Sequence, residues 1–83
     1  MNATEHANAA YRLLVAAPEG NDETLRQAGL HYRQAAKLAK AACEGIGYYQ
    51  YEALVNRIRY WCCTPAEKSQ EVRHLLWLAK PFA

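Results

Sequence analysis

Apolar residues recur along this chain at helical spacing, in stretches separated by proline and glycine. In the first stretch, residues 3–17, one face is formed by Ala7, Ala10, Tyr11, Leu14 and Ala17. Asn2 lies just before this stretch, and Glu5 lies three residues after Asn2. This is the spacing of a capping box. The pattern therefore predicts a first helix over residues 3–17, which ends before Pro18 because proline disfavours helix in the preceding residue.

The second and longest stretch, residues 22–44, carries an apolar stripe made mostly of small side chains. Its members are Leu25, Ala28, Tyr32, Ala35, Ala36, Ala39, Ala42 and Cys43. Gly29 costs about 1 kcal/mol relative to alanine inside a helix, so we expect it to mark close packing or a weak point. Gly45 and Gly47 predict the end of this helix, with one of them in the left-handed cap conformation.

The third and fourth stretches cover residues 48–63 and the chain after Thr64. The third carries the most regular amphipathic pattern, formed by Tyr51, Leu54, Val55, Ile58, Trp61 and Cys62. Thr64, Pro65 and Glu67 together predict the start of a fourth helix, because they combine a capping box with a proline at the first helical position. Its inner face is predicted to hold Val72, Leu75, Leu76 and Ala79.

These patterns indicate an all-α protein. Neither an Asn-Gly or Asp-Gly hairpin turn nor an alternating strand pattern occurs in the sequence. Connections as short as residues 18–21, 45–47 and 63–64 favour antiparallel neighbours. We predict a single domain over residues 1–83, folded as a compact antiparallel helical bundle of three to four helices.

Composition and charge limit the kinds of function that this protein can have. A net charge of +2 gives no general attraction to nucleic acid or to anionic lipid, so such binding would need a local patch. No apolar run approaches the ~20 residues that a membrane span requires, and the polar N-terminal stretch does not resemble a secretory signal. Three cysteines, two of them adjacent at Cys62 and Cys63, suggest reduced thiols and a cytoplasmic location.

Catalytic and metal chemistry find little support in the sequence. The possible metal ligands are His6, His31, His74, Cys43, Cys62 and Cys63. They do not form two closely spaced pairs, so we predict neither a metal site nor a cofactor. Cys63, before the predicted fourth helix and one turn after Arg59, is the best thiol candidate, yet no histidine partner is implied. We predict that the protein is not an enzyme.

Aromatic and arginine side chains outside the predicted core favour a binding function. They are Tyr49, Arg57, Tyr60, Arg73 and Trp77. Such side chains often anchor protein interfaces. We therefore expect a small binding or regulatory protein that occludes a surface of a partner protein or complex, as an inhibitor or accessory factor of a phage or plasmid does. The alternative is that these rings fold over the edges of the bundle, and self-association as a homodimer is a further version of the interface.

A basic stripe on the second helix supports a different function. Arg26, Arg33, Lys37 and Lys40 follow one another at spacings of seven, four and three, which places them along one side of that helix. Such a stripe could follow the phosphates of a nucleic acid. The interpretation without a function is a solvent-exposed basic face that the helix dipole favours. Nucleic-acid binding therefore stands as the alternative function.

Overall fold

The computed structural model describes residues 2–16, 22–43, 45–62 and 68–79. Within these ranges the side chains of residues 46, 59–62, 68–72 and 79 are not among those described. The described chain contains four helices: α1 (Ala3–Ala16), α2 (Asp22–Ala41), α3 (Gly45–Cys62) and α4 (Lys68–Ala79). No strand occurs among the described residues, so the predicted all-α class is confirmed.

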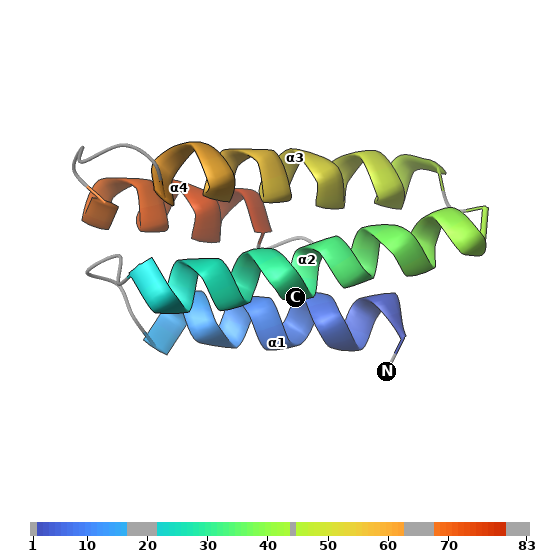
Figure 1. The fold of residues 1–83 in the computed structure, drawn as a ribbon, viewed down its shortest axis with the longest axis horizontal. Helices are drawn as coiled ribbons and strands as arrows, with labels where there is room; N and C mark the ends of the chain where they lie inside the picture. Colours follow the sequence, from blue (N-terminus) through green and yellow to red (C-terminus); the bar gives the residue numbers. More distant parts are fainter. Residues whose placement is uncertain (1, 17–21, 44, 63–67, 80–83) are drawn as a thin grey trace.

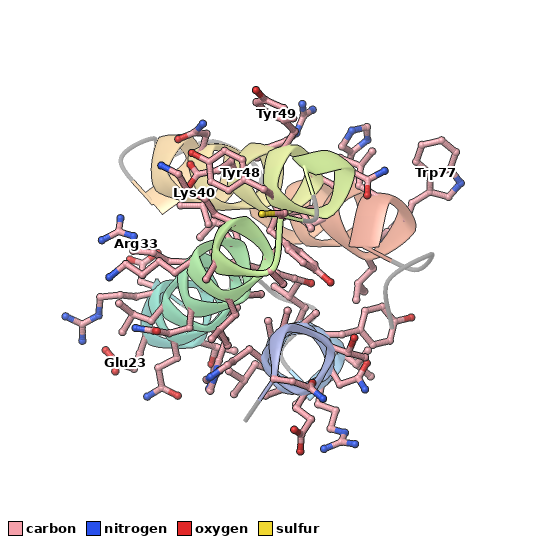
Figure 2. The ribbon with its side chains drawn as sticks, turned by 90° about the vertical axis from the view of Figure 1, so that its right-hand side faces the viewer. Glu23, Arg33, Lys40, Tyr48, Tyr49 and Trp77 are labelled. Atoms are coloured by element: carbon pink, nitrogen blue, oxygen red, sulfur yellow. The ribbon has the colours of Figure 1, made fainter. Side chains whose placement is uncertain are left out.

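Successive helices run antiparallel to one another along one long axis (Figure 1). α2 packs extensively against both α1 and α3, whereas α4 makes smaller contacts with α1 and α3. Viewed from one end, α4 closes the bundle between α1 and α3, on the side away from α2 (Figure 2). The molecule extends 36 × 20 × 19 Å, and the long dimension follows the helices. This is the antiparallel bundle that the short predicted connections favour.

The start of α1 is fixed by the predicted capping box. The backbone N–H of Glu5 donates to Asn2 Oδ1 at 2.8 Å, and the backbone N–H of Asn2 donates to Glu5 Oε1 at 2.9 Å. Each side chain thus satisfies a backbone donor that the first helical turn leaves without a partner. This local prediction from two residues is confirmed.

The end of α2 differs from the prediction. Gly45 and Gly47 do not end α2, because both lie in the first turn of α3, which begins three residues before the predicted Tyr48. The left-handed position is instead held by Cys43, whose φ is 59°. Its N–H donates to the carbonyl of Lys40 at 3.1 Å, a bond of the kind that closes a Schellman cap.

The core lies where the apolar stripes of the helices meet. Its buried residues are Ala7, Ala10, Leu14, Leu25, Ala28, Tyr32, Ala35, Ala36, Ala39, Tyr51, Leu54, Val55, Ile58 and Leu75. Every one of them was predicted from periodicity. Tyr11 and Leu76 are only partly buried. Ala42 and Cys43, predicted in the stripe of the second helix, are exposed because α2 ends at Ala41.

Several predictions fall on residues outside this description. The predicted cap of the fourth helix at Thr64 and Pro65 lies outside the described residues, as do the side chains of Trp61 and Cys62. The described part of α4 begins at Lys68. Leu75, on the predicted inner face of that helix, is completely buried.

Candidate functional site

The outer face of α4 carries the first candidate surface. Trp77 is 72% exposed, although Leu75, two residues earlier, is completely buried. Arg73 and His74 are exposed on the turn before Trp77, and the rings of His74 and Trp77 lie 6.3 Å apart with an angle of 36° between their planes. We call Arg73, His74 and Trp77 the α4 face. It combines a large apolar ring with nitrogen donors on the neighbouring turn.

The predicted protein-binding residues on α3 lie elsewhere. Tyr49 is also 72% exposed, and Arg57 is exposed, as predicted. Tyr49 points away from α3 while Trp77 points away from α4 in a different direction, and the two rings lie well apart (Figure 2). The side chain of Tyr60 lies outside the described set. The five predicted residues therefore do not gather around one centre, because Trp77 and Tyr49 belong to separate surfaces.

Tyr49 instead belongs to a group where the end of α2 meets the start of α3. The ammonium Nζ of Lys40 lies 5.6 Å from the ring centre of Tyr48, within the range of a cation–π contact. The rings of Tyr48 and Tyr49 lie 5.3 Å apart and tilt by 59°. We call Lys40, Tyr48 and Tyr49 the aromatic corner. Residues on two different helices form it, so the basic stripe of α2 ends beside two tyrosine rings (Figure 2).

The basic stripe itself is fully presented to solvent. Arg26, Arg33, Lys37 and Lys40 are all exposed, as periodicity predicts. Arg26 forms an ion pair with Glu23. Hydrogen bonds from Arg26 and from Gln27, the latter at 3.1 Å, together with the charge of Arg26, hold the pKa of Glu23 below its usual value. The Arg26 charge is thereby partly neutralised, and the stripe is most positive at Arg33, Lys37 and Lys40.

Exposed aliphatic side chains add little to either surface. Leu30 lies among the basic residues of α2 and is 56% exposed, and Leu38 is 37% exposed on the same helix. Val15 on α1 is exposed as well. Single exposed aliphatic residues are common in folded proteins, so they do not define a site by themselves.

Two of the possible metal ligands, His6 and His31, form a pair between α1 and α2 that the sequence did not predict. Nδ1 of His6 lies 3.1 Å from Nδ1 of His31, and the ring centres are 5.3 Å apart with a tilt of 38°. Both side chains are partly buried. Partial burial, followed by the charges of His31 and of the N-terminus, lowers the pKa of His6, and only Glu5 acts in the opposite direction. Spacing could not reveal this pair, because 25 residues separate its members.

Among the described residues, the possible thiol and metal-binding side chains form no large cluster. Cys43 is a free, exposed thiol, and Cys63 lies outside the described residues. In the part of the chain that the structure describes, histidine, cysteine and carboxylate side chains nowhere form a group of three or more that could hold a metal ion. The histidine pair brings two metal-ligating nitrogens within 3.1 Å of each other.

Comparisons with known proteins give no information on these surfaces. No protein-family model, curated protein or solved structure matches this chain. Among its described helices, none is both long enough and apolar enough to cross a membrane.

Proposed function

We propose that this chain is a small binding protein whose α4 face inserts Trp77 into a pocket of a partner protein. The observation that carries the proposal is the 72% exposure of Trp77 beside the completely buried Leu75. An indole ring offers a large apolar area with only two rotatable bonds, so tryptophan is among the residues that most often dominate interface energy.

The neighbouring residues indicate what kind of partner suits this face. Arg73 carries a positive charge, and His74 presents ring nitrogens next to the indole. A complementary surface would therefore combine an apolar pocket with carboxylate groups at its rim. Occlusion of such a pocket fits a regulatory or inhibitory protein, and a cytoplasmic setting remains part of this proposal.

Two exposed rings on separate surfaces allow a matched test. Wild-type protein, Trp77→Ala and Tyr49→Ala would be used to capture partners from a lysate, and the affinity of a purified partner would then be measured for all three. We expect Trp77→Ala to weaken binding at least about 30-fold, the effect of an interface hot spot, while Tyr49→Ala changes it little. Thermal unfolding should be nearly the same in all three proteins, because both rings are exposed.

The opposite results would overturn the proposal. If Tyr49→Ala abolished binding and Trp77→Ala did not, the aromatic corner would be the binding surface. If Trp77→Ala strongly lowered the melting temperature, the ring would be part of the fold. Sedimentation of the wild type and of Trp77→Ala would show whether the partner is a second copy of the chain, since a homodimer built on Trp77 would then dissociate.

The aromatic corner favours a second function, binding to a single-stranded nucleic acid. Arg33, Lys37 and Lys40 could contact phosphates while Tyr48 and Tyr49 stack on bases, an arrangement that combines the two main sources of single-strand affinity. Affinity should then fall steeply with salt, and Arg33→Glu with Lys37→Glu should abolish it. The control is Arg12→Glu with Arg57→Glu, which makes the same change in net charge at exposed positions on α1 and α3. Equal loss in both double variants, or no binding at low salt, would exclude this function.

A further inference from the structure

The antiparallel packing of α1 and α2 brings one histidine from each helix into contact. His6 lies at the end of the first turn of α1 and His31 in the middle of α2, and their Nδ1 atoms are 3.1 Å apart. Without a metal, a hydrogen bond at this distance requires one ring to donate from Nδ1 and the other to accept at Nδ1. The two neutral rings must then hold their hydrogens on different nitrogens.

The same spacing suits two ligands of one metal ion. Imidazole nitrogens bind zinc at about 2.0–2.1 Å, so two of them on neighbouring corners of a square or a tetrahedron lie about 2.8–3.4 Å apart. The Nδ1 atoms of His6 and His31 fall within this range. An ion could therefore take the place of the shared hydrogen once both rings turn so that their Nδ1 lone pairs converge on it.

We propose that His6 and His31 form a binding site for one divalent transition-metal ion of the group that imidazole prefers, Zn²⁺, Ni²⁺ or Cu²⁺. Both side chains are partly buried, so solvent can reach the pair and water can complete the coordination. In the bound state both Nδ1 atoms are ligands, and both ring hydrogens sit on Nε2. The ring that donated from Nδ1 therefore changes its tautomer, and the neutral pair loses no net proton.

Two charges of opposite sign act near the pair. The carboxylate of Glu5, next to His6 in sequence, favours a cation and also accepts the N–H of Asn2 in the cap of α1, whereas the charge of the N-terminus opposes a cation. A metal ion held by both helices would join α1 to α2 by bonds stronger than the present hydrogen bond. Binding of such an ion to the folded state alone should raise stability.

Metal titration of the whole chain tests the site. The three cysteines would first be replaced by serine, because thiolates also bind these ions. With Ni²⁺ or Zn²⁺ added to metal-free protein, we expect one ion per chain by calorimetry. We also expect a rise in melting temperature of about 5–10 °C at ten times the dissociation constant. His6→Ala and His31→Ala should each weaken binding at least about tenfold.

The exposed His74 on α4 provides the matched control. His74→Ala should leave the affinity unchanged, because among the described residues His74 does not join the pair in a metal-binding group. Binding that persists in His31→Ala, a loss that is as large in His74→Ala, or no binding at all would overturn the proposal. Nitrogen NMR of the histidine rings tests the site in the wild-type protein without any variant. Zn²⁺ should shift the Nδ1 resonances of His6 and His31 and leave the resonances of His74 unchanged. Shifts of the His74 resonances alone would contradict the site.

Discussion

The side chain of Ile58 on α3 covers Gly29 on α2. Its Cγ2 lies 3.3 Å from the position that a Cβ atom would occupy on this glycine. This spacing is tighter than an ordinary side-chain contact, so the absence of a side chain at Gly29 lets the two helices approach closely. Of the two roles expected for this glycine, a mark of close packing or a weak point, the structure shows close packing.

This contact predicts the effect of adding a methyl group at Gly29. In a helix interior, Gly29→Ala should gain about 1 kcal/mol from helix propensity, but the new Cβ must push Ile58 aside. In a double-mutant cycle measured by urea unfolding, we expect Gly29→Ala to be about 0.5–1 kcal/mol more favourable in an Ile58→Ala background than in the wild type. Gly45→Ala is the control, because its Cβ would meet nothing within 4 Å among the described residues. Additive effects of Gly29→Ala and Ile58→Ala would contradict the contact.

The left-handed conformation of Cys43 predicts a stabilising substitution. Residues with a Cβ are disfavoured by about 1–2 kcal/mol at positive φ, whereas glycine is not, so Cys43→Gly should stabilise the protein by about 0.5–1 kcal/mol. Ala42→Gly, one residue earlier, should not stabilise the protein, since among the described non-glycine residues it is Cys43, not Ala42, that has a positive φ. Denaturant unfolding measures the free energy of unfolding of both variants. Equal changes in Cys43→Gly and Ala42→Gly would argue against a left-handed cap at Cys43.

The buried hydroxyl of Tyr32 predicts that its removal is tolerated. Within the described residues this hydroxyl has no hydrogen-bond partner, and the ring is almost completely buried. Burial, together with Tyr11 and Tyr51, raises its pKa far above the usual range. Because a buried polar group without a partner costs free energy, Tyr32→Phe should be neutral or stabilising by about 1 kcal/mol. Thermal unfolding beside Tyr49→Phe, at an exposed ring, provides the measurement, and a loss of more than about 1 kcal/mol would reveal a lost hydrogen bond.

The histidine pair predicts a pH dependence of stability in metal-free protein. The pKa of His6 in the folded state is below its ordinary value of 6.5, mainly because of partial burial. Between these two pKa values the unfolded chain binds more protons than the folded one, so stability rises with pH. The contribution of His6 should be complete above pH 6.5 and lost as the pH falls through the folded-state pKa. In the presence of a chelator, urea unfolding at about pH 5 and about pH 8 should show a smaller difference for His6→Gln than for the wild type. An unchanged difference, or the same reduction in His74→Gln, would rule out this origin.

Local signals explain why so much of the fold could be predicted. The capping box of Asn2 and Glu5 depends on residues three apart, and both of its hydrogen bonds form. Periodicity assigned every buried residue to the core, because a helix buries whatever lies on one face. It also placed Trp77 and Tyr49 outside the core, where they lie. The glycine signal at Gly45 failed because glycine is tolerated both at a helix end and in a first turn, and sequence alone does not choose between them.

The sequence by itself therefore determined the helices, their inner faces and the exposed aromatic and basic residues. Only the tertiary structure decided which of these residues meet. The register of α1 against α2 pairs His6 with His31, and the packing of α4 against α1 and α3 directs Trp77 away from Tyr49. The reason is physical: helix formation depends on residues within one or two turns, whereas side-chain contacts between helices depend on how whole faces pack together.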